Sequence, residues 1–229
     1  MPYVNIKITR EGNVTPEQKR QLIEGATNLL HDVLGKNKAT TVVVIDEVET
    51  DNWGIGGVPV TEIAPYAFAG NQSLISIVIP DTVVKIGEQA FLNCPNLKSF
   101  SFTSSVKSFA KDVFQYTLGI ETVFYKGSVE DYLNIDFANY YSTPMLARSI
   151  MYMNGELLTE LTIPSSVIHV PAYAFYGCES LVTLNVPDTV VSFGDSAFAA
   201  TGIREVDLPS SVTTVNYGAF NDCYSLLRI

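Results

Sequence analysis

The first residue of this chain whose type could do chemistry is Pro2. If the initiator Met1 is removed, the nitrogen of Pro2 becomes a free secondary amine instead of part of a peptide bond. An α-amino group titrates near about 8, and an apolar pocket disfavours its charged form, so this amine could act as a base near neutral pH. Pro2 is therefore either a catalytic base or a simple consequence of N-terminal processing.

Other residue types that do chemistry form no recognised motif. His31 and His169 have no companions at metal-ligand spacing, and the three cysteines are odd in number and far apart. No Ser-His-Asp arrangement, phosphate loop or paired-carboxylate motif is present. We therefore expect no metal site and no cofactor, and no disulfide framework.

Composition excludes several classes of function. The 229 residues are 47% hydrophobic, which is enough for one large core or two smaller ones. The net charge of −10 and the lack of a Lys/Arg run argue against nucleic acid as a partner. No apolar run approaches the roughly 18 residues of a membrane span. No basic region followed by an apolar stretch is visible at the N-terminus, so a cytoplasmic protein is expected.

Residues 1–59 contain the elements that must position Pro2. "YVNIKIT" alternates apolar and polar residues and predicts a strand, and "TTVVVIDEV" predicts a second one. Between them, Thr15 and Gln18 form a capping box and Gly35 is a natural helix end. A crossover of this length favours a parallel strand pair with a right-handed connection. The apolar face of the helix comprises Leu22, Ile23, Ala26, Leu29, Leu30 and Val33.

The stretches "PYVNIKITREG", "TPEQKRQLIEGAT" and "DNWGIGG" together resemble the small subunits of the 4-oxalocrotonate tautomerase family. The resemblance implies that the amine of Pro2 moves a proton between carbon and oxygen of a small enol or keto acid. It also implies homo-oligomers, assembled through this N-terminal domain, in which sites are shared between chains.

Two arginines bind the acid groups in family members that act on dicarboxylates. Val42 stands at the place of the second arginine, and Arg10 corresponds only loosely to the first because the loop differs in length. The resemblance places Trp53, in the glycine-rich turn, on the apolar side of the pocket. Without the resemblance, Trp53 would be a core or interface residue and Arg10 a solvated charge.

Residues 60–229 repeat with a period of about 23 residues. In register the units are "VTEIAPYAFAGNQSLISIVIPDT", "VVKIGEQAFLNCPNLKSFSFTSS", "VKSFAKDVFQYTLGIETVFYKGS", "VIHVPAYAFYGCESLVTLNVPDT", "VVSFGDSAFAATGIREVDLPSS" and "VTTVNYGAFNDCYSLLRI". The pattern of Ala-Phe, Leu, two alternating apolar residues and Pro resembles the BspA-like class of leucine-rich repeats. The predicted fold class is α/β: a small β-α-β tautomerase domain (residues 1–59) followed by a leucine-rich repeat solenoid (residues 60–229).

Each repeat can be explained by burial. Apolar residues such as Ile77 and Ile79 alternate with polar ones and predict a short strand with its apolar side inward. No single unit can bury this side alone, so the strands should stack as a parallel sheet along one face. Cys94, Cys178 and Cys223 share one position of the repeat and predict a ladder of small, mildly polar side chains. A second ladder should consist of Phe68, Phe91, Phe114, Phe175, Phe198 and Phe220.

An enlarged repeat covers residues 129–166. Asn154 and Gly155 between two apolar stretches predict a hairpin with a type I′ turn, whose second strand should end in the repeat strand at Leu161 and Ile163. The segment before it is expected to pack on the solenoid, and a binding site is the alternative. Its aromatic candidates are Tyr132, Tyr140 and Tyr141.

Two functions remain open. The first is a proline-dependent tautomerase that carries a recognition solenoid. The second is a repeat-based interaction or adhesion protein whose N-terminal domain only caps and oligomerises. A protein partner would use the outward strand residues, a bland face with Phe124 as its one aromatic anchor. These residues are Ser76, Val78, Ser99, Ser101, Thr122, Phe124, Glu160, Thr162, Thr183, Asn185, Glu205 and Asp207.

Overall fold

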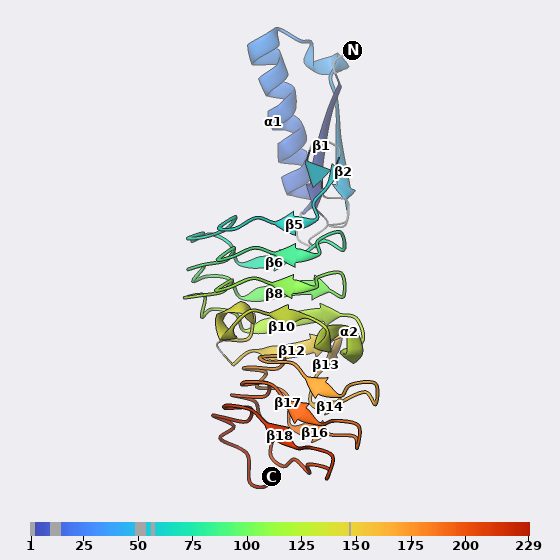
Figure 1. Ribbon diagram of the computed structural model, residues 1–229. Coiled ribbons are helices and arrows are strands. Elements are labelled where there is room, and N and C mark those ends of the chain that lie inside the picture. Colours follow the sequence, from blue (N-terminus) through green and yellow to red (C-terminus); the bar gives the residue numbers. More distant parts are fainter. Residues whose placement is uncertain (1–2, 10–14, 49–53, 56–57, 147) are drawn as a thin grey trace. The chain divides into compact units, whose positions relative to one another are not determined.

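The computed structural model describes residues 3–9, 15–48, 54–55, 58–146 and 148–229 (Figure 1). The chain divides into two compact units, residues 1–54 and 55–229, and each is described by itself. Two short strands, β3 (Gly54–Ile55) and β4 (Val58–Pro59), pair with each other where the sequence passes from one unit to the next.

The N-terminal unit is a β-α-β unit, as predicted. Strand β1 (Tyr3–Thr9) is followed by helix α1 (Pro16–Leu34), the 3-10 turn η1 (Lys38–Thr40) and strand β2 (Val42–Val48). The two strands are parallel, in a register that pairs Tyr3 with Val42 and Thr9 with Val48. A helical crossover is what a parallel pair requires, because a tight turn can join only antiparallel strands.

Helix α1 begins and ends where the sequence predicts. The Gln18 N–H donates to Thr15 Oγ1 at 3.2 Å, and the Thr15 N–H donates to Gln18 Oε1 at 2.8 Å, which completes the capping box. At the other end Gly35 has φ +62° and its N–H donates to the His31 carbonyl at 2.9 Å. Glycine adopts this left-handed conformation without a steric penalty, so the helix stops there.

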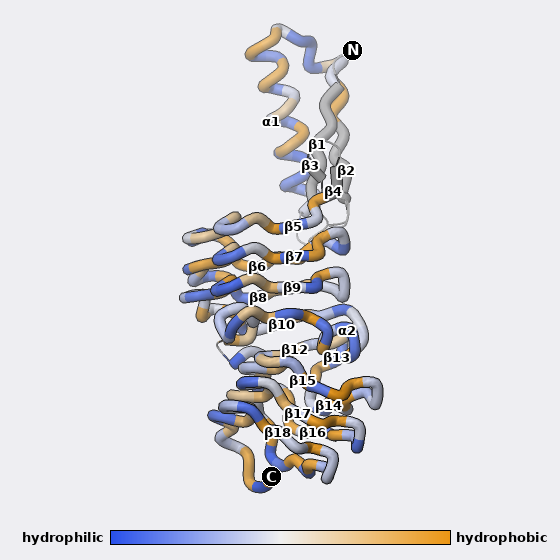
Figure 2. The backbone as a smooth tube through the Cα atoms, viewed as in Figure 1, coloured by the Kyte–Doolittle hydropathy of each residue, from blue (hydrophilic) through white to orange (hydrophobic). Residues whose placement is uncertain are grey.

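The apolar side chains of α1 are largely exposed. None of its residues is buried, and Leu29 and Val33 are 62% and 68% exposed. Figure 2 shows hydrophobic and hydrophilic residues alternating along the helix. The amphipathic pattern is therefore present, but its apolar face is only partly covered within the described part of this chain: Ala26 and Leu30 are half-buried and the larger part is exposed.

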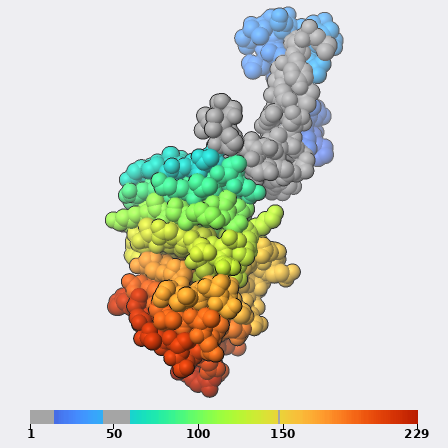
Figure 3. Space-filling view, turned by 45° about the vertical axis from the view of Figure 1, so that its right-hand side comes forward, coloured from blue at the N-terminus to red at the C-terminus, as the bar shows by residue number. Residues whose placement is uncertain are grey.

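Residues 60–229 form a solenoid in which each turn contributes a strand to one sheet and a shorter strand to another. The colour bands of Figure 3 follow one another in sequence order along it, so each repeat contacts its sequence neighbours. The first sheet has the order β13-β12-β10-β8-β6 and the second β11-β9-β7-β5; toward the C-terminus the sheets are β14-β16 and β15-β17-β18. The strands are β5 (Glu62–Ile63), β6 (Ser76–Val78), β7 (Lys85–Ile86), β8 (Ser99–Thr103), β9 (Ser108–Phe109), β10 (Thr122–Lys126), β11 (Asp136–Phe137), β12 (Ile150–Met153), β13 (Glu156–Leu157), β14 (Glu160–Thr162), β15 (His169–Val170), β16 (Thr183–Asn185), β17 (Ser192–Phe193) and β18 (Thr214–Val215).

The parallel sheet predicted for one face is confirmed, and a second parallel ladder accompanies it. In the first sheet Ile77 pairs with Phe100, and both are buried while their strand neighbours point outward. In the second, Ile86 pairs with Phe109 in strands of only two residues. Two residues are too few for alternation to be recognised in the sequence, which is why this ladder was not predicted.

The predicted phenylalanine ladder is present on both sides of the enlarged repeat. Phe91 stacks on Phe68 at 5.1 Å between ring centroids and on Phe114 at 5.5 Å. Phe198 stacks on Phe175 at 5.5 Å and on Phe220 at 5.7 Å. Offset stacking of this kind adds to the stabilisation from burial, so each ring ties two repeats together.

The ladder of small polar side chains is also confirmed. Cys94 Sγ donates to the Phe68 carbonyl at 3.0 Å, and Cys223 Sγ donates to the Phe198 carbonyl at 3.1 Å. At the equivalent position Thr117 donates to the Phe91 carbonyl and accepts a bond of 2.9 Å from the Cys94 N–H. The thiols and hydroxyls thus bond to backbone groups of the preceding repeat and connect neighbouring turns.

The enlarged repeat differs from its prediction. The hairpin exists, with Asn154 and Gly155 at φ +54° and +87°, but its second strand is only β13, which pairs antiparallel with β12. Strand β12 pairs parallel with β10 and so continues the first sheet, whereas Leu161 lies in β14, which pairs with β16. The expectation that one strand would serve both as hairpin arm and as repeat strand is therefore wrong.

The excursion before the hairpin is a short insertion within a regular turn. Strand β8 pairs Ser99 with Thr122 of β10, an offset of 23 residues, and β10 pairs Thr122 with Ile150 of β12, an offset of 28. The additional residues form α2 (Val129–Leu133), after which β11 joins β9 in the second ladder. A further 3-10 turn, η3 (Tyr140–Ser142), precedes β12.

Candidate functional site

The three residues predicted to form the tautomerase site are Pro2, Arg10 and Trp53, and all lie outside the described residues. What the structure describes is the strand pair beside which they stand in the sequence. Tyr3 begins β1 and pairs with Val42, which begins β2, so both strands start at the same edge of the sheet. Val42 is half-buried, and its isopropyl group can pack on a ligand but cannot bind a carboxylate.

In the solenoid, the predicted outward residues of β6, β8 and β10 lie on the outer face of the first sheet. Val78, Ser101 and Phe124 stand opposite one another, and the same row continues to Tyr152 and Leu157. Phe124 is 40% exposed, and its ring stacks on that of Tyr152 with centroids 5.2 Å apart and planes at 23°. The face therefore carries an aromatic pair where the sequence predicted a single aromatic anchor.

Tyr152 was not predicted to lie on this face. The repeat pattern predicts the sheet strand at Leu161, which makes the segment with Tyr152 only the first arm of a hairpin. A signal for the correct assignment exists: Met151 and Met153 alternate around Tyr152, and both are buried. In a strand that continues the sheet, this pattern places Tyr152 outward.

The tyrosines of the enlarged repeat pack on other aromatic rings, although Tyr140 is 39% exposed. Tyr132 of α2 is fully buried, with its ring centroid 4.9 Å from Phe175 and 5.0 Å from Tyr125. Burial raises the pKa of Tyr132 well above its ordinary value. Tyr140 and Tyr141 contact each other with ring centroids 3.9 Å apart, and a hydrogen bond with Tyr141 raises the pKa of Tyr140 to about 12. The expectation that this segment packs on the solenoid agrees with these positions.

Tyr132 compensates for a break in the phenylalanine ladder. The Phe91 N–H donates to the carbonyl of Val113, the residue before the next ladder phenylalanine, at 3.0 Å. The Phe114 N–H instead donates to the carbonyl of Tyr141 at 2.8 Å. The residue after Tyr141 is Ser142, so Ser142 occupies the position of a ladder phenylalanine. Serine cannot fill that volume, and Tyr132 supplies the aromatic contact to Phe175 from α2.

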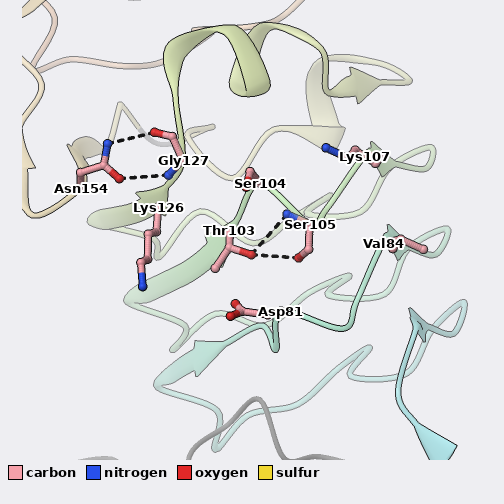
Figure 4. A pocket seen from close by; sticks show the side chains of 9 residues that line it. All are labelled: Asp81, Val84, Thr103, Ser104, Ser105, Lys107, Lys126, Gly127 and Asn154. Carbon is pink, nitrogen blue, oxygen red and sulfur yellow. Dashed lines mark hydrogen bonds between the residues drawn. The ribbon is translucent and has the colours of Figure 1, made fainter.

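An open depression of about 700 Å³ lies at the C-terminal ends of β8 and β10, with nine lining residues (Figure 4). Its polar side chains include Lys126, Asp81, Thr103 and Ser105, and Thr103 Oγ1 and Ser105 Oγ are 2.9 Å apart. Asn154 of the hairpin turn forms part of the wall. The Gly127 N–H donates to Asn154 Oδ1 at 3.0 Å, and Asn154 Nδ2 donates to the Gly127 carbonyl at 2.9 Å.

Chemistry beyond these two places finds little support in the described ranges. No group of three or more His, Cys, Asp or Glu side chains there is arranged to hold a metal ion. None of the helices in that part of the chain is long and apolar enough to cross a membrane. All three cysteines are buried and free, and burial raises the pKa of the Cys178 thiol to about 11. A thiol with so high a pKa is a poor nucleophile near neutral pH.

Comparison with known proteins identifies both units. Residues 2–63 match the family described as tautomerase enzyme. Probable tautomerase K2 of Dickeya dadantii is 74% identical over 62 residues, which cover 27% of this chain and 91% of that protein. A probable tautomerase of Helicobacter pylori is 57% identical over 58 residues, or 25% of this chain and 85% of that protein. The N-terminal unit is therefore of the tautomerase type, and tautomerases are a class of isomerases.

The solenoid matches the BspA type leucine-rich repeat region over residues 59–146 and 147–229. A leucine rich cell surface protein from Faecalibacterium prausnitzii A2-165 is 27% identical with a TM-score of 0.51 over 76% of this chain, but only 44% of that chain is covered. The two family matches overlap at residues 59–63, so the predicted boundary after residue 59 stays a prediction. The chain belongs to the tautomerase family through its N-terminal unit and to the BspA type leucine-rich repeat family through the remainder.

Proposed function

We propose that the chain is a proline-dependent keto-enol tautomerase of a small enol or keto acid, joined to a repeat domain that acts as a recognition module. The observation that carries this proposal is that the match to the tautomerase family begins at residue 2, at Pro2 itself. The β-α-β unit that follows has the parallel register and the helix caps expected of such a unit.

The proposed chemistry needs one group that can both accept and donate a proton. Once Met1 is removed, the neutral amine of Pro2 accepts the proton of the enol hydroxyl, and the resulting ammonium donates a proton to the neighbouring carbon. The enol thereby becomes the keto form and the amine returns to its neutral state, so no co-reactant is required. In this proposal Arg10 binds the substrate carboxylate and Trp53 packs on its apolar part.

Val42 points to a substrate with a single carboxylate. It begins β2 opposite Tyr3, where the resemblance would place a second acid-binding arginine in enzymes of dicarboxylates. A buried carboxylate without a cationic partner is costly, so a second acid group at this edge would be bound poorly. We therefore propose a monocarboxylate with an apolar remainder, such as the enol of phenylpyruvate.

The test combines a mass measurement with an assay on the same sample. The intact mass of the purified chain shows whether Met1 is present, and the ultraviolet absorbance of phenylpyruvate enol follows its ketonisation. Pro2→Ala keeps a terminal amine but changes its class and geometry, and should lower kcat/KM by about 100-fold or more. Pro16→Ala, at the exposed first position of α1, is the matched control and should leave the rate unchanged.

A processed N-terminus with equal rates for Pro2→Ala and the parent chain would overturn the proline mechanism. The proline mechanism would also be overturned if a processed chain converts neither phenylpyruvate nor a dicarboxylate such as 2-hydroxymuconate. Either result would favour the alternative function, an interaction solenoid whose N-terminal unit only caps and oligomerises.

We also propose that the N-terminal unit assembles with copies of itself. Five large apolar side chains of α1 are substantially exposed, which is unusual for one helix of a small unit. They are Leu22, Ile23, Leu29, Val33 and Leu34. A further argument is size: about 54 residues bury little apolar surface on their own.

Sedimentation velocity tests this assembly. The double variant Leu29→Lys and Val33→Lys should shift the oligomer to monomers, because charged groups on the apolar face oppose its burial. Glu24→Lys, which lies on the opposite side of α1, should leave the oligomer intact. A parent chain that sediments as a monomer at all concentrations would contradict the proposal.

A further inference from the structure

The outer face of the first sheet combines two features that nothing in the tautomerase chemistry uses. One is the stacked pair of Phe124 and Tyr152, and the other is the open depression beside Lys126. They adjoin, because Phe124 and Lys126 are alternate residues of β10 and point to the same face, about 7 Å apart along the strand. We call the two together the β10 surface.

Lys126 has an ammonium group available for a ligand. Lys85, Lys98 and Lys111 form ion pairs with Glu62, Glu121 and Asp112. Lys107, which lines the same depression, acts only at longer range: hydrogen bonds with Ser128 are the main cause that lowers the pKa of Asp131, and the charge of Lys107 adds to it. Lys126 is the one lysine of residues 60–128 for which the described part of the chain provides no carboxylate partner. Its strand pairing with Thr103 fixes where its side chain begins.

The depression also offers a carboxylate, which accepts hydrogen bonds, and two neighbouring hydroxyl groups. The carboxylate of Asp81 lines the same space as Lys126 and has no ion pair or hydrogen bond within the described ranges (Figure 4). The hydroxyls of Thr103 and Ser105 contact each other and can each donate or accept. Asn154 is held by its two bonds to the Gly127 backbone, which fix the position of its side chain in the wall beside Lys126.

Mixed donors and acceptors beside an aromatic ring suit a sugar better than an extended peptide. A pyranose ring has an apolar C–H face that packs on an aromatic ring. Tyr152 covers one face of Phe124, and on the other side stands only the small Ser101. The sugar hydroxyls need close donors and acceptors. The volume of about 700 Å³ lies within the range of small-molecule sites, although this one is open and polar. An extended peptide would need an unpaired strand edge, whereas β10 is paired on both sides.

Lys126 favours an acidic sugar, and the local charge does not oppose one. Residues 60–128 contain five lysines and five acidic residues, whereas residues 129–229 contain three arginines and eleven acidic residues. An anionic ligand is thus repelled by the C-terminal repeats but not by those that form the β10 surface. We propose that the β10 surface binds a glycan that contains uronic acid, with its carboxylate on Lys126, its hydroxyls on Asp81 and Thr103, and its ring on Phe124.

The test uses the full chain and two oligosaccharide probes in isothermal titration calorimetry. The first probe is a hyaluronan hexasaccharide, which alternates glucuronate with N-acetylglucosamine, and the second is the neutral chitohexaose. The parent chain should bind hyaluronan more tightly than chitohexaose. Lys126→Gln should remove about tenfold of that affinity, since a charge-assisted bond to the carboxylate is lost, and leave chitohexaose binding unchanged.

Phe124→Ala should weaken both probes, because the ring packs on the sugar face whatever its charge. Lys98→Gln, a lysine paired with Glu121, is the matched control and should bind as the parent chain does. Equal losses for Lys98→Gln and Lys126→Gln would show diffuse charge attraction and overturn the site. Failure of both probes to bind at about 10 mM would overturn it as well, and would leave a protein as the occupant of this face.

Discussion

In the solenoid a ladder of large apolar side chains is buried and stacked, whereas in the N-terminal unit most of the large apolar side chains of α1 are exposed. Phe91, Phe114 and Phe198 have no accessible surface, and each ring contacts that of a neighbouring repeat. Leu29 and Val33 have similar chemistry but lie open on a helix with no buried residue. The difference shows that a repeat covers its apolar face with the next repeat, whereas the β-α-β unit has no such neighbour in its own sequence.

The comparison also separates two sources of stability. The solenoid gains its stability from contacts between consecutive repeats, so it should not depend on protein concentration. The N-terminal unit should gain part of its stability from copies of itself, so its unfolding should depend on concentration. Substitutions that are chemically alike should therefore have different effects in the two units.

The largest effect is expected for the phenylalanine ladder. Phe91→Ala removes a ring that stacks on two others, and should lower the free energy of unfolding of the solenoid by about 3–5 kcal/mol. Leu29→Ala, on the exposed face of α1, should leave the unfolding of the solenoid unchanged. Urea unfolding followed by circular dichroism checks both; similar losses from the two would contradict the comparison.

Much of the solenoid could be predicted because each of its features recurs. The phenylalanine position and the shared position of Cys94, Cys178 and Cys223 appear in unit after unit, and repetition separates signal from chance. The enlarged repeat occurs once, so its two possible strands could not be distinguished by comparison within the chain. For this reason the hairpin turn at Asn154 was predicted correctly while the extent of its second strand was not.

The candidate sites could be predicted only in part. Pro2 was proposed from its residue type and position, and it remains a prediction together with Arg10 and Trp53. The β10 surface could not be predicted as a unit, because it joins Asp81, Thr103, Lys126 and Asn154, which are brought together only by the stacking of successive turns. No local pattern marks residues that lie one repeat apart.

A second expected effect is loss of stability at alkaline pH, located in the solenoid. Burial raises the pKa of Cys178 from the ordinary 9.0 to about 11, so between these pH values the unfolded chain binds fewer protons than the folded one. Stability should therefore fall as pH rises through this window, by roughly 2–3 kcal/mol from this thiol. Urea midpoints at about pH 8.5 and about pH 10.5 would measure this loss of stability, because the two pH values are about as far apart as the two pKa values of Cys178.

Cys178→Ala removes the titrating thiol and should flatten the pH dependence relative to the parent chain. Tyr125 and Tyr132 are also buried with raised pKa values, so some alkaline loss should persist in the variant. If the variant and the parent chain lose the same stability over this window, the thiol is not the group responsible.

Glycine substitutions should have opposite signs in the two units. At Gly194 an added Cβ would lie 2.4 Å from the backbone nitrogen of Ala172, so Gly194→Ala must displace the backbone of the neighbouring turn. We expect it to destabilise the solenoid by about 1–3 kcal/mol. At Gly25 of α1 nothing lies within 4 Å, so Gly25→Ala should stabilise the helix by up to about 1 kcal/mol, through helix propensity alone.

Thermal unfolding followed by circular dichroism distinguishes the two effects. Gly194→Ala should lower the Tm of the solenoid, whereas Gly25→Ala should leave more helical signal at a given temperature. A destabilising Gly25→Ala would mean that this side of α1 is covered in solution. Because Gly25 and Leu29 are four residues apart and lie on the same side of α1, that result would extend the proposed assembly contact from Leu29 to Gly25.

The smallest effect is expected for the surface ion pairs, which occur in both units and so test whether burial or charge makes the difference. Lys85 Nζ lies 2.9 Å from Glu62 in the solenoid, and Arg20 lies 2.7 Å from Glu17 on α1. All four side chains are about half exposed or more, so solvent screens the attraction and ordering the side chains offsets it. Lys85→Met keeps the aliphatic stem and should change the urea midpoint only slightly. The change should be smaller still in roughly 0.5 M salt, because the Debye length there is about 4 Å and the ion-pair attraction is screened. A large loss that salt abolishes would show that charge, and not the stacked core, holds successive repeats together.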